Sequence, residues 1–244
     1  MWRAPRIIYM SDDPGQLGKV LPEPVAAQVD RRWDDSVSMG LLERLTGADY
    51  LSLVALLFAW TSVILVVGGE VNWGILAMLG SFLFDKLDGY YARKYDLASP
   101  FGRQIDSFID VFAYLVTGAL VYHVALSPHP ALSVLVGFAI IGFGGLRLVR
   151  HATEGFGEES GTSYYVGYTV VHANVVVLVT YYLDVFVAGW NGWFAAVPIL
   201  AVCPLMVSGY RSYKTTVGHA IAGTVCLVAG SISLGIELAA AGVL

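Results

Sequence analysis

The chain of 244 residues is 57% hydrophobic and only 14% charged, and its mean hydropathy is +0.66. This composition lies far outside the range of a soluble globular domain and indicates an integral membrane protein. The net charge of −5 is modest and gives no reason to expect nucleic-acid binding.

The first part of the chain differs from the rest. Residues 1–44 are polar and lack the apolar core of a signal peptide, so we expect a cytoplasmic tail with an interfacial helix near 36–45. Seven later stretches are apolar and long enough to cross a bilayer as helices, at 49–68, 72–92, 103–126, 131–150, 165–188, 190–208 and 217–242. The polar insert 153–163 is expected to be a solvated loop. The predicted fold class is an all-α polytopic membrane protein with about six to seven transmembrane helices.

The basic residues define an orientation. If the N-terminus is cytoplasmic, all 14 lysines and arginines fall on the cytoplasmic side. The opposite loops, near Glu70, 128–130 and Asp184, contain no lysine or arginine, and neither does the C-terminus. We therefore expect the N-terminus inside and the C-terminus outside, in a multi-pass protein of the cell membrane.

Two of the apolar stretches carry aspartates. Asp85 and Asp88 are three residues apart and share one face of the second predicted helix. Gly102, Asp106 and Asp110 recur at intervals of four on the third. A hairpin between these helices would set the two acidic stripes face to face.

Converging carboxylates inside a membrane protein must be protonated, paired with cations or bound to metal. Pairing with Lys86, Arg93 or Arg103 is the structural alternative. Oxygen ligands favour hard divalent cations such as Mg²⁺, Mn²⁺ or Ca²⁺, and two such ions would balance four carboxylates. Two metals suit a phosphoryl or pyrophosphoryl substrate. Gly89 and Gly102 would let a nucleotide approach the backbone, and Arg93 can bind a phosphate.

The same stretch resembles a known family. Its pattern matches the signature of the CDP-alcohol phosphotransferases at every fixed position: Asp85-x2-Asp88-Gly89-x2-Ala92-Arg93-x8-Gly102-x3-Asp106-x3-Asp110. The resemblance implies a homodimeric membrane enzyme that transfers a substituted phosphoryl group from a CDP-linked lipid to an alcohol and releases CMP. It covers residues 45–215 as a catalytic membrane domain and leaves 216–244 as an additional C-terminal transmembrane helix.

The resemblance also implies roles for individual residues. The four aspartates, Asp85, Asp88, Asp106 and Asp110, would bind two divalent ions, Mg²⁺ or Mn²⁺, and Asp110 would also be the general base. The CDP moiety would lie against Gly89, Ala92, Arg93 and Gly102.

The acceptor alcohol is suggested by further segments. Three segments resemble phosphatidylserine and archaetidylserine synthases. They are the motif FD-x-LDG, the following motif FG-x3-DS-x2-DVF, and CPLMVSGYRSYK at 203–214. L-serine is therefore the expected acceptor. Its carboxylate requires a cationic contact, for which the candidates are Arg147, Arg150, Arg211 and Lys214. His172 and Asn174 either line the pocket or form hydrogen bonds between helices.

Other interpretations stay open from the sequence. Inositol phosphate, glycerol phosphate or another small alcohol could replace serine as the acceptor. A divalent-cation transporter that uses the acidic cluster as its ion site is an alternative of another class. The lipid of the donor, diacylglycerol or archaeol, is not specified by the apolar helices, which are solvated alike by both.

Overall fold

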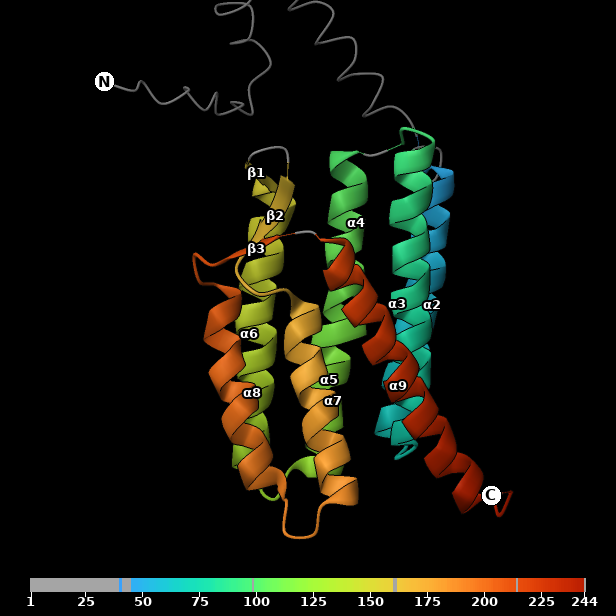
Figure 1. The fold of residues 1–244 in the computed structure, drawn as a ribbon, viewed down its shortest axis with the longest axis vertical. Coiled ribbons are helices and arrows are strands. Elements are labelled where there is room, and N and C mark those ends of the chain that lie inside the picture. Colours follow the sequence, from blue (N-terminus) through green and yellow to red (C-terminus); the bar gives the residue numbers. More distant parts are fainter. Residues whose placement is uncertain (1–39, 41–44, 98, 160–161, 214, 244) are drawn as a thin grey trace, which may run out of the picture. The chain divides into compact units, whose positions relative to one another are not determined.

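The computed structural model describes residues 40, 45–97, 99–159, 162–213 and 215–243 (Figure 1). The chain divides into the units Met1–Leu45 and Thr46–Leu244, and all the helices and strands given below belong to the second. The expected tail and its interfacial helix lie outside the described residues except for Gly40 and Leu45, as does the candidate contact Lys214.

Seven helical stretches are present in the described part of the chain, as predicted. They are α2 (Gly47–Val67), α3 (Val71–Lys94), a continuous third stretch (α4 Pro100–Asp110, η3 Val111–Val116, α5 Thr117–Val121, η4 Tyr122–Leu126), α6 (Pro130–Glu154), α7 (Val170–Phe186), α8 (Gly192–Met206) and α9 (Thr216–Ala240).

Four described helical segments have the length and apolar composition to cross a membrane, namely 47–67, 101–126, 130–154 and 220–240. Helices α7 and α8 are apolar but shorter. Helix α3 has 24 residues, and its last ten include Asp85, Lys86, Asp88, Arg93 and Lys94. Because of these charges, α3 is not among the four helices that are apolar enough to cross a membrane. The sequence already indicated that the stretch with the aspartates is less apolar than the others.

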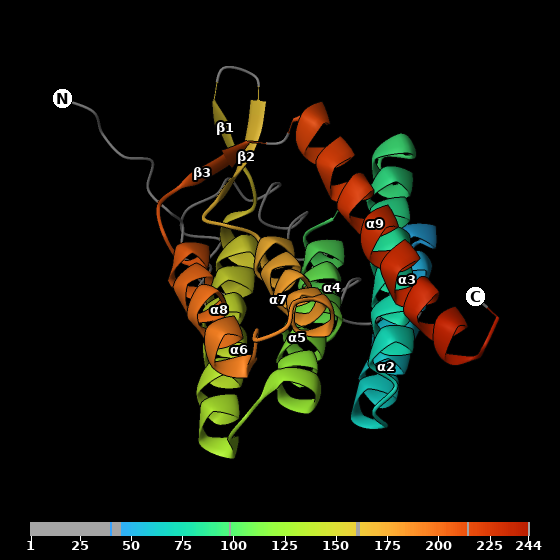
Figure 2. The ribbon, with the colours of Figure 1, turned by 60° about the horizontal axis from the view of Figure 1, so that its bottom comes forward.

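Helix α2 begins at a capping box and packs closely on α3. The Thr46 hydroxyl accepts a hydrogen bond from the Asp49 amide, and the Asp49 carboxylate accepts from the Thr46 amide at 2.7 Å. A side chain at Gly80 of α3 would collide with the ring of Phe58 on α2. Small residues at such contacts let two membrane helices approach closely. The two helices run side by side in both ribbon views (Figures 1 and 2).

The hydrophobic core lies between α3, the third helical stretch and α6. Buried side chains from α3, η3 and α6 meet there, including Ile75, Leu115 and Ile140. At the end where α8 starts, the buried Tyr122 hydroxyl donates to the Gly192 carbonyl. Helix α9 crosses α3 obliquely and is largely exposed, as Figure 2 shows.

The third helical stretch widens into a π-helical turn directly after Asp110. This turn, η3, carries the buried Tyr114, and the Thr117 hydroxyl bonds to the Phe112 carbonyl five residues earlier. Single π-helical turns are often found at functional sites. The irregular turn therefore lies next to the predicted catalytic aspartate.

A small sheet corrects the all-α expectation and the prediction that 153–163 is a loop. Strands β1 (Gly157–Glu159), β2 (Thr162–Val166) and β3 (Arg211–Tyr213) pair antiparallel in the order β1-β2-β3. The residues of β2, Thr-Ser-Tyr-Tyr-Val, are mostly β-branched or aromatic and favour a strand. Helix α7 consequently begins at Val170 rather than near 165.

The sheet lies at the end of the bundle where α3 ends and α4 begins (Figure 1). Glu159 on β1 links the two outer strands, because it accepts hydrogen bonds from two residues of β3, Arg211 at 2.7 Å and the Tyr213 hydroxyl at 2.5 Å. These two donors hold the pKa of Glu159 below its usual value. The sheet thus brings together two segments that are distant in the sequence.

Candidate active site

The structure arranges the two acidic stripes so that their charges act on each other. Asp85 and Asp88 lie on α3, and Asp106 and Asp110 lie on α4. The Asp106 carboxyl interacts electrostatically with both α3 aspartates, and the Asp110 carboxyl with Asp85 and Asp106. Carboxyls of the two helices therefore influence each other electrostatically, and the face-to-face arrangement of the two stripes stays a prediction.

The aspartates do not form a closed metal cage. Among the described residues, no three His, Cys, Asp or Glu side chains lie close enough together to hold one ion. The binuclear metal site stays a prediction.

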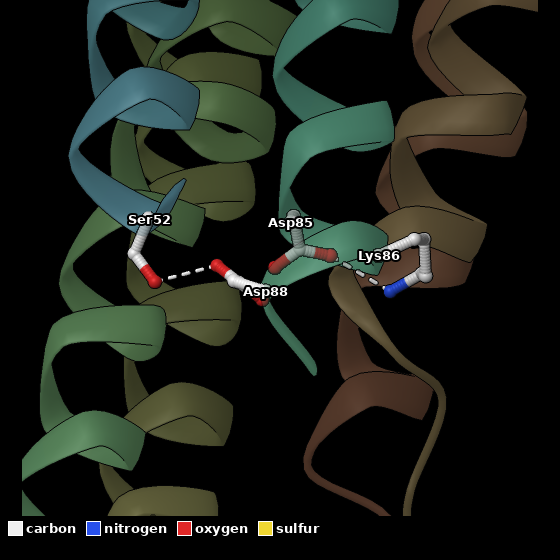
Figure 3. A network of polar contacts seen from close by, with 4 residues as sticks. All are labelled: Ser52, Asp85, Lys86 and Asp88. Atoms are coloured by element: carbon white, nitrogen blue, oxygen red, sulfur yellow. Dashed lines mark hydrogen bonds and ion pairs between the residues drawn. The ribbon is translucent and has the colours of Figure 1, made fainter. Parts of the chain in front are cut away.

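Asp88 is the most deeply buried of the four aspartates, with 4% of its surface exposed. The buried Ser52 hydroxyl of α2 donates to its Oδ2 at 2.5 Å (Figure 3). This partner was not expected from the sequence. The signal was present, because Asp49 and Ser52 are spaced by three residues on one face of an apolar helix.

Asp85 is paired with its neighbour in the chain. The Lys86 ammonium lies 2.7 Å from Asp85 Oδ2 (Figure 3) and 5.0 Å from the centre of the Phe82 ring. The structural alternative, pairing of the acids with nearby cations, is thus realised for Asp85. In the described part of the chain, Arg93 and Arg103 form no ion pair with any of the four aspartates.

Asp106 and Asp110 accept no side-chain hydrogen bond within the described ranges, and both are half-buried. A fifth carboxylate, Asp49, acts electrostatically on Asp106 but is itself engaged in the α2 capping box. The free oxygens, together with the lack of nitrogen or sulfur ligands among the predicted set, suit a hard divalent cation such as Mg²⁺ or Mn²⁺. The donor set therefore fits the predicted ions.

The predicted CDP contacts lie at the adjacent ends of α3 and α4. The Arg93 guanidinium folds back over Gly89, where an added Cβ would lie 3.3 Å from Nη1. Ala92 is half-buried beside them. The Gly102 amide donates to Ser99 Oγ at 2.9 Å and so starts α4. These residues of the signature thus lie near the ends of the two helices that carry the aspartates, and their contact with CDP stays a prediction.

The candidate acceptor contacts separate into two kinds. Arg150 donates to the carbonyls of Val166, Met206, Val207 and Ser208, and so joins β2 to the end of α8. Arg211 is exposed and paired with Glu159. Both have structural partners, which the distribution of basic residues along the chain did not reveal.

Arg147 of α6 differs from those two arginines. Its side chain is 3% exposed, stands 5.2 Å from the ring centre of Tyr165, and its charge acts on Asp110. Tyr165 lies on β2, and burial raises its pKa. A role for Tyr165 was not expected from the sequence, because position 165 was predicted to start a helix.

The two polar residues of α7 have local structural roles. His172 takes part in the N-terminal cap of the helix through the Thr169 hydroxyl, at 2.7 Å. The buried Asn174 amide donates to the Met78 sulfur of α3 at 3.0 Å. Asn174 therefore forms the interhelical contact that was one of the two expectations.

Replacing Lys86 by glutamine is expected to tighten Mn²⁺ binding about two- to fivefold, because the ammonium competes with a cation for Asp85 and the exposed pair is worth about 0.5–1 kcal/mol. Mn²⁺ titration of the substrate-free protein, followed by calorimetry, measures the effect. Lys94→Gln removes an exposed lysine that stands near the rings of Tyr90 and Tyr95, and serves as the control. Unchanged or weaker binding in Lys86→Gln would show that the lysine does not compete.

Comparison with known proteins identifies the family of the chain. Residues 45–203 match the CDP-alcohol phosphatidyltransferase family. The chain belongs to this family. It is 30% identical over 162 residues to an archaetidylserine synthase of Methanothermobacter thermautotrophicus, covering 66% of each chain.

A second relative shares a shorter segment. The chain is 39% identical over 70 residues to a CDP-diacylglycerol–serine O-phosphatidyltransferase of Methanocaldococcus jannaschii, covering 29% of this chain and 34% of the relative. The chain thus spans slightly less than two thirds of the first relative and about a third of the second.

Proposed function

We propose that the protein transfers a phosphatidyl or archaetidyl group from a CDP-linked lipid to the hydroxyl of L-serine and releases CMP. The observation that carries this proposal is the pair of acidic stripes on α3 and α4, inside the segment that matches the family. Serine as acceptor is supported by the two relatives, whose names both specify a serine product or acceptor. Membership of the family favours the enzyme over the cation transporter.

The proton of the acceptor hydroxyl passes to Asp110. The hydroxyl oxygen then forms a bond to the β-phosphorus of the CDP-lipid, while the bond from that phosphorus to the oxygen of CMP breaks. Asp110 suits this role because its carboxylate has no hydrogen-bond partner among the described side chains and is half-buried within electrostatic range of Arg147.

The remaining aspartates would bind and orient. Asp85, Asp88, Asp106 and Asp110 would hold two Mg²⁺ or Mn²⁺ ions, which when bound neutralise the charge on the pyrophosphate. The hydrogen bond from Ser52 holds the Asp88 carboxylate in one orientation. Arg93, at Gly89, would bind a phosphate of the donor.

The proposed active site lies on the cytoplasmic side of the membrane. The ends of α3, α4 and α6 that carry the basic residues lie together with the sheet (Figure 1), which supports a cytoplasmic active site under the positive-inside rule. The protein would be a multi-pass protein of the cell membrane with a cytoplasmic N-terminus, working on a membrane lipid. A homodimer is implied by the family resemblance and stays a prediction.

The acceptor is tested by CMP release from purified protein with CDP-diacylglycerol or CDP-archaeol and Mn²⁺. We expect release with L-serine and none above background with inositol phosphate or glycerol phosphate. Release with one of the phosphorylated acceptors instead would keep the reaction and overturn serine. No release with any acceptor by folded protein, together with Mn²⁺ uptake into vesicles that contain the protein, would support the transporter.

A further inference from the structure

Arg147 is a buried cation that contacts an aromatic ring but no anion among the described residues. Its side chain is 3% exposed, and within the described ranges it forms no hydrogen bond and no ion pair. The other arginine of this helix end, Arg150, donates to four carbonyls. Both arginines lie on α6, one turn apart. They therefore differ in their bonding partners and not in their position along the helix.

None of the Arg147 nitrogens is among the fully buried atoms without a partner, and Arg147 lines a small cavity with Arg150 and Glu154. Its donors are therefore open to an anion. A guanidinium presents its N–H groups as a planar fork that matches a carboxylate or a phosphate. The Tyr165 ring, 5.2 Å away, supports the charge through a cation–π contact without using these donors. Arg147 is thus held in place with its hydrogen-bonding capacity left for a ligand.

The reaction has two anionic groups that Arg147 could bind, the carboxylate of serine and the phosphates of the CDP-lipid. The position of Arg147 favours the carboxylate. Helix α6 packs against α4, and the Arg147 charge acts on Asp110, the proposed base for the acceptor hydroxyl. In L-serine only two carbon atoms separate the hydroxyl oxygen from the carboxylate carbon. A group that binds this carboxylate must therefore lie near the base. The donor phosphates have their own arginine, Arg93, beside Gly89 on α3.

We propose that Arg147, supported by Tyr165, binds the carboxylate of the acceptor amino acid and so determines its selection. This inference rests on the proposed function, since it requires an acceptor that carries a carboxylate next to its hydroxyl. The small sheet would then contribute to acceptor binding, because β2 supplies Tyr165 from outside the helical bundle.

The test is the kinetics of CMP release by the full chain, with L-serine and with serinol, which replaces the carboxylate by a hydroxymethyl group. In Arg147→Gln we expect the KM for L-serine to rise about 10- to 100-fold, the size of a lost charged hydrogen-bonded pair. The KM for the CDP-lipid should change less than about threefold, and the preference for L-serine over serinol should fall. Arg147→Lys should recover part of the loss, because it restores the charge but not the planar fork.

Two further variants keep the test decisive. Tyr165→Leu leaves the arginine in place and should raise the KM for L-serine about 2- to 30-fold, even if the Arg147 variants do not fold. Arg211→Gln removes a guanidinium that is paired with Glu159 on the sheet, and should leave this KM unchanged.

Three results would overturn the inference. An equal loss with L-serine and serinol would assign Arg147 a structural role, and a rise in the KM for the CDP-lipid would assign it to the donor phosphate. An unchanged KM for L-serine in both Arg147→Gln and Tyr165→Leu would exclude both residues from acceptor binding. Absence of serine-dependent release in the wild type would instead refute the proposed function itself.

Discussion

Replacing Asp110 by asparagine is expected to lower serine-dependent CMP release by about 10²- to 10⁴-fold. Asparagine has nearly the same shape as aspartate, but it cannot take the proton of the acceptor hydroxyl and binds a divalent cation less strongly. Because Asp110 accepts no side-chain hydrogen bond from the described residues, the substitution breaks no such contact. CMP release at saturating CDP-lipid and L-serine measures the loss, and thermal unfolding of the same preparation checks that the variant is folded.

Asp96→Asn is the matched control for this substitution. Asp96 is exposed in the turn after α3 and has a φ of 54°, a left-handed conformation that asparagine also tolerates. The control should keep wild-type activity. A folded Asp110→Asn variant that releases CMP at the wild-type rate would remove Asp110 from the reaction.

Arg150→Ala is expected to destabilise the protein by about 3 kcal/mol or more, since the guanidinium forms charged hydrogen bonds that are worth about 1.5–3 kcal/mol each and are not additive. The shortest two join it to the carbonyls of Val166 and Met206, at 2.5 and 3.0 Å. Without Arg150, the last carbonyls of α8 lose a donor in a half-buried place. Thermal unfolding in detergent measures the change.

Gly167 shows how closely the chain packs around Arg150. Gly167 has a φ of +81°, and a Cβ there would lie 2.7 Å from Arg150 Nη2 and collide with the Met206 carbonyl. Arg150→Lys should restore only part of the stability, because an ammonium cannot reach four carbonyls from one position. Arg211→Ala, at an exposed ion pair, should leave the stability nearly unchanged.

An Arg150→Ala variant with unchanged stability would contradict the structural role of Arg150. If Arg150→Ala unfolds like the wild type and instead raises the KM for L-serine, then Arg150 is the acceptor contact and its bonds to the carbonyls are secondary. The pair of variants at Arg147 and Arg150 therefore separates binding from stability within one turn of α6.

The helices and the acidic stripes could be predicted from the sequence because both depend on local periodicity. Runs of apolar residues indicated each helical stretch, and the spacing of Asp85, Asp88, Asp106 and Asp110 fixed which residues share a face. The helical cap at Ser99 followed by a proline was likewise a local signal.

The sheet and the roles of the arginines could not be predicted in this way. The strand β3 pairs with β2 across about 45 residues of sequence, a non-local pairing that propensity does not reveal. Positive-inside counting places Arg147, Arg150 and Arg211 on the same side without distinguishing them, since it measures charge and not partners. Which of them meets carbonyls, a carboxylate or only a ring depends on tertiary packing.

The most direct test of the central claim follows radiolabelled L-serine into lipid. Purified protein is incubated with Mn²⁺, the labelled serine and either CDP-diacylglycerol or CDP-archaeol, and the label in the extracted lipid is compared with the CMP released. The account predicts that label enters the lipid only when a CDP-lipid is present, with one CMP released for each serine transferred. CMP release by folded protein without label in the lipid, or no transfer from either donor, would contradict it.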